Sequence, residues 1–278
     1  MRYSIIDCHH HMMASPGYVD DLVKECDALG VDRVCLIAPW VEGGNDLLAK
    51  EVAKYPDRIA GYALVDWDND TPSDIEKYKE MGLTGLKFIR PPANYHDQRW
   101  YPLYERAEEV QMPGLFHLGI VGRSNPDRAY QGPAGSDLSN VRTFVDSSLM
   151  RPVFLDTIAR AFPTWMIVGA HLGNPWYDEA AMSARWNPNL FFDLSGSTLK
   201  KKTPEFLGSL LWWTPYTRYK DPEGRYAWEK IVFGSDVSHF EIRDVIRDYE
   251  YVMEELNLAP EIREAIFGGT ARKILGLK

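Results

Sequence analysis

The sequence predicts an α/β fold, a single (β/α)8 TIM barrel that spans residues 1–278. Eight short apolar runs recur along the 278 residues, and helical patterns separate most of them. Strands that alternate with helices form βαβ units and a parallel sheet. Eight such units match a closed barrel, which takes up ~250 residues as one domain. No linker or composition break divides the chain.

The expected strands are short and almost continuously apolar, as is typical of parallel strands that helices cover. They lie at residues 4–6, 33–38, 59–65, 85–89, 114–118, 166–170, 190–194 and 231–234. An open doubly wound sheet shows the same alternation of strands and helices. Neither a GxGxxG after the first strand nor a P-loop is present, so the barrel is favoured.

The expected helices lie between these strands. In residues 19–29, apolar side chains recur with the spacing of one buried helix face. Gly30 follows at once, as a left-handed C-terminal cap requires. Other helical segments are expected at 47–54, 74–81, 103–110, 153–162, 204–213 and 242–256. Residues 119–151 are polar and contain Gly and Pro, which predicts a loop over the active face.

Composition excludes several classes of function. The net charge is −9, without the basic face that nucleic-acid binding requires. No stretch approaches the ~20 apolar residues of a membrane span, and the first residues do not form a signal peptide. Three cysteines without CxxC spacing indicate a reducing setting. We therefore expect a cytoplasmic protein without a nucleic-acid or membrane partner.

Metal-binding side chains lie at the ends of the expected strands, where barrels carry their active sites. In a strand, His9 and His11 face one side, while His10 and Cys8 face the other. A nitrogen and oxygen site of this kind suits Zn²⁺, Mn²⁺ or Fe²⁺ with a position left for water. We expect one divalent metal, preferably Zn²⁺, near five side chains: His9, His11, His117, His171 and Asp236.

At this point the chain resembles the amidohydrolase superfamily, and more closely its amidohydrolase-related branch. That branch includes aminocarboxymuconate-semialdehyde decarboxylase, resorcylate-type decarboxylases, 4-oxalomesaconate hydratase and several hydrolases. The similarity covers nearly the whole chain. It rests on IIDCHHHM, PLYERAEEVQMPGLFHLG, FPTWMIVGAHLGN, IVFGSD and GGTARKILGL.

The resemblance implies roles for the site residues. It makes four of them the ligands of a single metal: His9, His11, His117 and Asp236. His171 would then be the catalytic histidine that orients or deprotonates the metal-activated water. Elsewhere in the superfamily, the strand-six histidine binds a second metal, and a carboxylated lysine at the end of strand four bridges the two ions.

Lys87 stands at that strand-four position, in GLTGLKFI, where the decarboxylase pattern has no lysine. We expect Lys87 to reach out of the barrel or to pair with a carboxylate. A two-metal site with carboxylated Lys87 and His171 is the alternative.

Substrate-binding candidates follow the strands. Any of three arginines could clamp a substrate carboxylate bidentately: Arg90, Arg123 and Arg142. His239, three residues after Asp236, could enter the same pocket. Three tryptophans after strands two, three and six could line an aromatic site: Trp40, Trp67 and Trp176. An ordinary surface or loop-packing role is the alternative for each.

The residues leave three functions open. The first is hydrolysis of a small carboxylate-bearing amide, ester or lactone, with Asp236 accepting the proton of water and His171 stabilising the oxyanion. The second is non-oxidative decarboxylation, in which the substrate is protonated at carbon and loses CO₂. The third is a non-catalytic ligand-binding barrel, which the complete ligand set disfavours. The partner is expected to be a small carboxylate substrate, and the resemblance also implies a homodimer.

Overall fold

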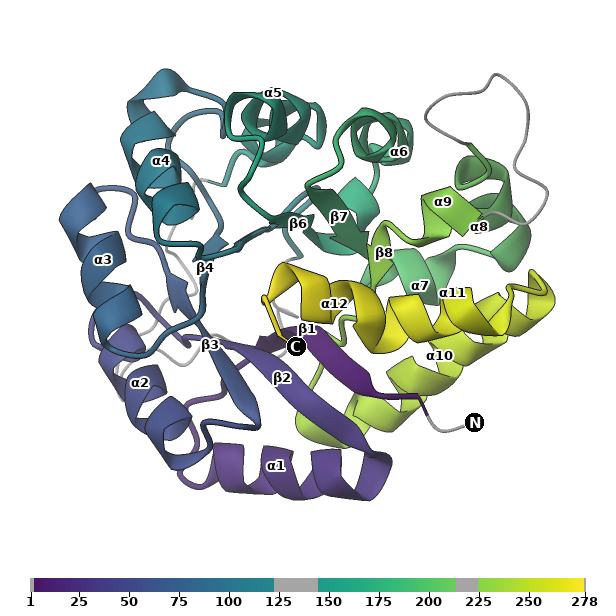
Figure 1. The fold of residues 1–278 in the computed structure, drawn as a ribbon, viewed down its shortest axis with the longest axis horizontal. Coiled ribbons are helices and arrows are strands. Elements are labelled where there is room, and N and C mark those ends of the chain that lie inside the picture. Colours follow the sequence, from purple (N-terminus) through teal and green to yellow (C-terminus); the bar gives the residue numbers. More distant parts are fainter. Residues whose placement is uncertain (1–2, 123–144, 214–224, 278) are drawn as a thin grey trace, which may run out of the picture.

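The structure is a computed structural model that describes residues 3–122, 145–213 and 225–277. One sheet of eight parallel strands, paired in the order β1 to β8, forms its centre (Figure 1). Backbone hydrogen bonds from Cys8 N to Phe233 O (2.9 Å) and from Asp236 N to His9 O (2.7 Å) link the first strand to the last. The predicted (β/α)8 barrel is confirmed.

Each expected apolar run overlaps one strand. The strands are β1 (Ile5–His11), β2 (Val31–Ile37), β3 (Ile59–Leu64), β4 (Gly85–Phe88), β5 (Gly114–Phe116), β6 (Ile167–Gly169), β7 (Leu190–Asp193) and β8 (Ile231–Val232). The largest difference is in β1, which was expected at 4–6 and extends to His11. Its pairing with β2 continues to the register pair His11 and Ile37, so both histidines of the HxH pair lie inside a strand.

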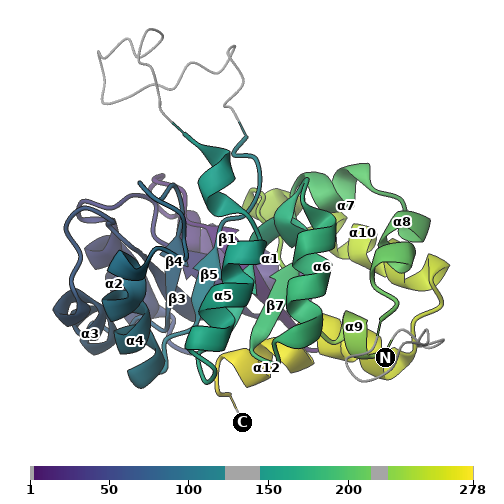
Figure 2. The ribbon, with the colours of Figure 1, turned by 90° about the horizontal axis from the view of Figure 1, so that it is seen from above.

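The helices surround this sheet, and Figure 2 shows α2 to α6 standing alongside the strands. Their bounds are α1 (Tyr18–Leu29), α2 (Gly44–Lys54), α3 (Pro72–Glu80), α4 (Tyr101–Glu109), α5 (Val153–Ala161), α6 (Tyr177–Trp186), α7 (Ser197–Lys201), α8 (Pro204–Leu210), α9 (Arg225–Trp228), α10 (Ile242–Glu255), α11 (Pro260–Glu264) and α12 (Thr270–Ile274). As predicted, Gly30 caps α1 with a left-handed φ of 74°. None of the described helices is long and apolar enough to cross a membrane.

Helix α6 was not expected from the sequence. The side chains that it buries include Ala180, Ala181, Ser183 and Ala184, which are too small to produce a strong apolar stripe. Helix α8 was expected to continue to residue 213 and ends at Leu210.

One end of the barrel is closed. Ala271 and Ile274 of α12 belong to the apolar cluster that fills the barrel interior, together with Ile6 and Val232. Just before α12, a Cβ on Gly268 would lie 2.2 Å from Ser4 O, so the chain passes directly against the start of β1. In Figure 2, α12 lies across the lower end of the strands. Access to the interior is therefore left to the end where the strands finish.

Candidate metal centre

Strand β1 sends two histidines into the interior of the barrel. The rings of His9 and His11 lie 5.3 Å apart between centroids. His10 is fully buried on the other side, where its Nδ1 lies 2.9 Å from Ser235 Oγ and its Nε2 lies 2.8 Å from Tyr18 Oη. The alternation predicted for these three histidines therefore holds.

The same alternation fails at Cys8, which was expected on the side of His10. Cys8 belongs to the interior cluster with Cys35 and Tyr62. The pairing of β1 with β2 shifts register between Asp7 and His10, which is the mark of a β-bulge. A bulge re-aims side chains and often lies next to an active site. Here it lets the consecutive residues Cys8 and His9 both face inward.

Asp236, just after β8, lies at the centre of the histidines. Its Oδ1 is 3.7 Å from His9 Nε2 and 3.7 Å from His11 Nε2. Its Oδ2 is 3.8 Å from His171 Nε2. One ligand atom each from His9, His171 and Asp236 can be chosen so that all three lie within 4.8 Å of one another. Three strands that are far apart in sequence thus direct donors at one point.

The backbone at these strand ends is left-handed. His171 has a φ of 61° in the short 3₁₀ turn that follows β6, and Asp236 has a φ of 47° after β8. Such conformations are costly for residues other than glycine and tend to cluster at functional sites. Arg90, with a φ of 51° after β4, is a third non-glycine residue in this conformation at a strand end.

His117, just after β5, faces the same region. Its ring centroid is 5.0 Å from that of His171. The Nε2 of His117 is buried and has no hydrogen-bond partner among the described residues. A buried polar atom without a partner is costly unless an ion or water satisfies it. This atom therefore supports a bound group at the centre.

The donor set fits a divalent metal. Ligand atoms ~2.0–2.2 Å from one ion lie roughly 3.4 Å apart in a tetrahedral arrangement. The separation of 3.7 Å between His9 Nε2 and Asp236 Oδ1 is close to that value. Burial and the charge of Lys87 hold the pKa of His11 well below its usual range, and burial and neighbouring His171 do the same for His117. Both imidazoles stay neutral at neutral pH, which is the form that binds metals.

Lys87 corrects one prediction. Its side chain is fully buried, and its Nζ lies 3.0 Å from His9 Nε2 instead of leaving the barrel or pairing with a carboxylate. Burial lowers the pKa of Lys87 to about 8, although the charges of Asp236 and Asp193 oppose that shift. The amine thus contacts the same imidazole nitrogen that would bind a metal.

Asp193 is a site residue that sequence reasoning missed. It is the last residue of β7 and is fully buried, and its Oδ2 lies 3.0 Å from His9 Nδ1. Carboxylates in this position orient metal-binding histidines. A signal was available, because FFD places a carboxylate at the end of an apolar strand, as FGSD does for Asp236.

Among the described residues, no hydrogen bond, ion pair or ring contact joins the remaining candidates to this cluster. Arg90 is exposed and has no hydrogen bond or ion pair within the described ranges. Trp176 lies under the guanidinium of Arg151, at 5.4 Å from the ring centroid. His239 packs edge-on against Tyr18 at 5.1 Å. Arg123 and Arg142 lie outside the described residues.

The other two tryptophans also have resolved positions. Trp67 is partly buried, donates from Nε1 to Ile89 O (2.7 Å) and packs against Phe88 and Trp100 of the core. Trp40 is exposed.

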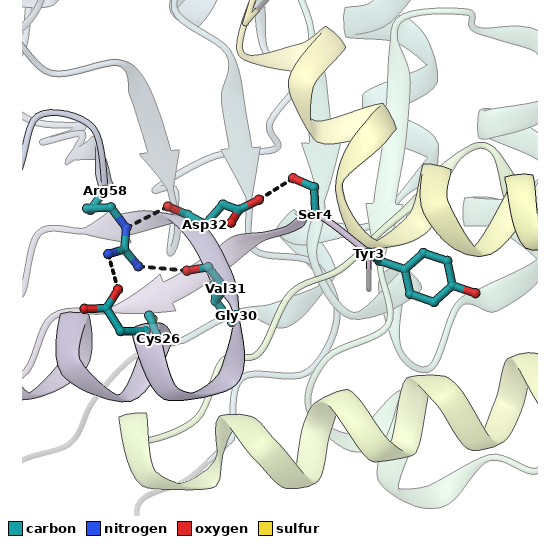
Figure 3. Close-up of a pocket in the computed structure, with 8 residues that line it drawn as sticks. Tyr3, Ser4, Cys26, Gly30, Val31, Asp32 and Arg58 are labelled. Atoms are coloured by element: carbon teal, nitrogen blue, oxygen red, sulfur yellow. Dashed lines mark hydrogen bonds and ion pairs between the residues drawn. The ribbon is translucent and has the colours of Figure 1, made fainter. Parts of the chain in front are cut away.

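A surface hollow of about 600 Å³ lies elsewhere, beside the residues that precede β1, β2 and β3 (Figure 3). Arg58 crosses it and donates to Asp32 O and Val31 O, both at 2.8 Å, and it also pairs with Asp27. Each of its three guanidinium nitrogens therefore contacts an acceptor of the protein itself. The hollow is thus at the opposite end of the strands from the histidines and has no unpaired charge.

The family model described as Amidohydrolase matches residues 6–277. The chain therefore belongs to the amidohydrolase family, as the motifs predicted. Among curated proteins, it is similar to the 2-keto-4-carboxy-3-hexenedioate hydratase of Sphingobium sp. (strain NBRC 103272 / SYK-6), with 29% identity over 101 residues. That match covers 32% of this chain and 29% of the hydratase.

Two solved structures show the same fold across almost the full length of both chains. One is a probable 2-pyrone-4,6-dicarboxylic acid hydrolase from Acinetobacter baumannii with citric acid bound, with 14% identity, a TM-score of 0.64, and coverage of 99% of this chain and 100% of that one. The other is a dihydroxybenzoic acid decarboxylase from Polaromonas sp. JS666 with bound manganese, with 16% identity, a TM-score of 0.63, and coverage of 99% and 97%. The proteins to which this chain is similar in sequence or fold thus include a hydratase, a probable hydrolase and a decarboxylase.

Proposed function

We propose that this chain is a metal-dependent hydrolase that acts on a small carboxylate-bearing amide, ester or lactone. The observation that carries the proposal is the convergence of His9, His171 and Asp236 at the open end of the barrel, with the unpaired Nε2 of His117 beside them. Membership of the amidohydrolase family supports the same class of chemistry. We further propose that residues 1–278 act as one catalytic domain.

One divalent ion, Zn²⁺ or Mn²⁺, would be held by the four ligands that the resemblance assigns: His9, His11, His117 and Asp236. When bound, such an ion lowers the pKa of water towards 7 and polarises a carbonyl oxygen. Nitrogen and carboxylate donors suit both metals.

The side chains supply the proton transfers. The Asp236 side chain is 26% exposed, so water can reach its carboxylate. In the proposed reaction, Asp236 accepts a proton from the attacking water and passes it to the leaving group. His171 Nε2, 3.8 Å from Asp236 Oδ2, orients this water. Arg90 is the described residue that we propose for the carboxylate of the substrate, with Arg123 and Arg142 as further candidates.

Decarboxylation is the second candidate, and similarity to the dihydroxybenzoic acid decarboxylase favours it. In that reaction the same side chains would hold a carboxylate substrate, and His171 would move a proton to carbon as CO₂ leaves. The residues at the site are compatible with both reactions, so the products must separate them.

Product analysis tests the proposal. The chain is stripped of metal, reloaded with Zn²⁺ or Mn²⁺, and incubated with small carboxylate-bearing lactones, esters and amides and with hydroxybenzoates. Cleavage of the lactone, ester or amide bond with the uptake of one water supports hydrolysis. Release of CO₂ would instead identify the reaction as decarboxylation. Equal turnover by the stripped and the reloaded protein overturns metal dependence.

A further inference from the structure

Asp193 contacts two histidines of the candidate centre, His9 and His171. One oxygen, Oδ2, lies 3.0 Å from His9 Nδ1. The other, Oδ1, accepts hydrogen bonds from the backbone N of His171 (3.0 Å), from the backbone N of Ser195 (2.9 Å) and from Ser195 Oγ (2.5 Å). Asp193 and Ser195 are both fully buried, so water does not compete for these contacts.

The direction of each hydrogen bond follows from the chemistry of the partners. A carboxylate is ionised at neutral pH and only accepts. His9 Nδ1 must therefore carry the proton that it shares with Asp193. The other nitrogen of His9 agrees, because the Lys87 ammonium 3.0 Å away can only donate and needs a lone pair on Nε2.

The same reasoning fixes His171. Ser195 gives its single hydroxyl hydrogen to Asp193, so Ser195 Oγ must accept from His171 Nδ1 at 2.9 Å. The carbonyl oxygen of Ser195, 3.3 Å from the same nitrogen, can also only accept. His171 Nδ1 therefore carries a proton, and the lone pair is on Nε2, which faces Asp236.

We propose that Asp193 is a positioning residue that holds both imidazoles in the Nδ1–H tautomer, directly for His9 and through Ser195 for His171. Both unprotonated Nε2 atoms then lie near the Asp236 carboxylate, at 3.7 Å and 3.8 Å, and that of His9 also accepts from Lys87. An acceptor that faces another acceptor needs a cation or a proton donor between them. The inference rests on the proposed metal-dependent function, and it makes neutral His171 an acceptor for water rather than a donor to an oxyanion.

Two glycines keep this arrangement compact. A Cβ on Gly234 would lie 3.0 Å from the Cβ atoms of both His9 and Asp193. A Cβ on Gly196, where φ is +66°, would lie 3.1 Å from His171 Nδ1. The backbone is thus close to the Cβ atoms of His9 and Asp193 and to the ring of His171. These contacts hold His9 near Asp193 and favour one orientation of the His171 ring.

The test uses Asp193→Asn, which keeps the shape of the side chain. Its amide oxygen can still accept from the two backbone N–H groups, which leaves the NH₂ group facing His9 Nδ1. His9 Nδ1 must then accept, which moves its proton to Nε2 and requires Lys87, 3.0 Å from that nitrogen, to become the neutral amine. We expect ¹⁵N spectra of the histidine rings in the metal-free protein to show this tautomer change for His9. Affinity for Zn²⁺, measured by chelator competition, should fall 10- to 100-fold.

Ser195→Ala is the second variant and removes the link to His171, together with a longer contact of 3.5 Å between Ser195 Oγ and His9 Nδ1. It should change the tautomer of His171, whereas His9 should keep its proton on Nδ1 because Asp193 Oδ2 still accepts it at 3.0 Å. Ser235→Ala is the matched control, because this buried serine contacts His10 Nδ1 at 2.9 Å. It should alter His10 alone.

The outcomes separate the two proposals. If Asp193→Asn folds and keeps the Nδ1–H tautomer of His9 with wild-type Zn²⁺ affinity, the positioning role is overturned. If Asp193→Asn does not fold, an unchanged His171 spectrum in Ser195→Ala overturns it. A third outcome is that the wild-type protein shows the proposed Nδ1–H tautomers but binds no Zn²⁺. This would support the positioning role of Asp193 and refute the metal-dependent function.

Discussion

Replacement of Lys87 by methionine should strengthen metal binding. The Nζ of Lys87 lies 3.0 Å from His9 Nε2, the lone pair that the metal needs. An ammonium group there both occupies that lone pair and repels a divalent cation. Methionine has a similar length and no charge, so Lys87→Met removes the competitor and keeps the buried volume.

The pKa of Lys87 sets the size of the effect. Burial lowers that pKa to about 8, so the amine is mostly protonated at pH 7 and must lose its proton before a metal binds His9. Removing a proton one pH unit below the pKa costs about 1.4 kcal/mol, or about tenfold in affinity. Lys87→Met should therefore bind Zn²⁺ about tenfold more tightly than the wild type at pH 7. The difference should disappear above pH 9, where the lysine is already neutral.

Competition with a fluorescent chelator measures the Zn²⁺ affinities of the wild type and of Lys87→Met at pH 7 and pH 9. The matched control is Lys230→Met, because Lys230 is also buried with a pKa lowered to about 8. Its Nζ donates to Asn187 O and Pro188 O at 2.9 Å each, away from the histidines, so its affinity for Zn²⁺ should match the wild type. The reasoning is wrong if Lys87→Met binds Zn²⁺ more weakly, or if the wild type takes up two equivalents and the variant one. Lys87 would then hold metal, as a carboxylated lysine does.

Three further changes test other parts of the molecule. His171→Asn should retain about one equivalent of metal by elemental analysis, because all four proposed ligands remain. Its kcat should fall by ~10²–10⁴-fold. Loss of the metal would instead show that His171 is a ligand. Asn189→Ala should lower the free energy of unfolding by ~2–4 kcal/mol in urea titrations. The reason is that Asn189 Nδ2 donates to Ala159 O, Phe162 O and Trp165 O at 2.9–3.2 Å. A loss below ~1 kcal/mol would contradict this. The pKa of Lys230 is about 8 in the folded chain, below its value in the unfolded chain, so the unfolded chain binds more protons between pH 8 and pH 10.5. Over that range, the free energy of unfolding of the wild type relative to Lys230→Met should rise by up to ~3 kcal/mol, and it should stay flat from pH 6 to pH 7.

The barrel could be predicted from sequence because its strands are buried on both faces. Each strand therefore contains a short apolar run, and eight such runs are visible without any alignment. Helix α6 escaped prediction because it packs through Ala180, Ala181 and Ala184, where small size rather than hydrophobicity makes the contact. Contacts made by small side chains depend on the shape of the neighbouring surface, which the sequence of one segment does not contain.

The histidines and Asp236 could be predicted because each lies at or near the end of a strand. The hydrogen-bond partners of the histidine Nδ1 atoms were harder to predict, since they depend on which strands meet across the barrel. Asp193 contacts His9 although 184 residues separate them in the chain. No periodicity within one segment shows such a contact.

The orientation of Lys87 did have a sequence signal, which is the alternation along β4. Leu86 and Phe88 pack in the layer between the sheet and the helices, so Lys87 between them must face the interior. In the register of the sheet, Lys87 stands beside Leu115, an interior residue. The alternation argument that placed His9 and His11 on one face thus applied equally to β4. Across the interior, His9 follows the β1 bulge and its Nε2 lies 3.0 Å from Lys87 Nζ. This contact decides between two kinds of centre. Either one metal competes with the Lys87 amine for His9, or two metals are bridged by a carboxylated Lys87.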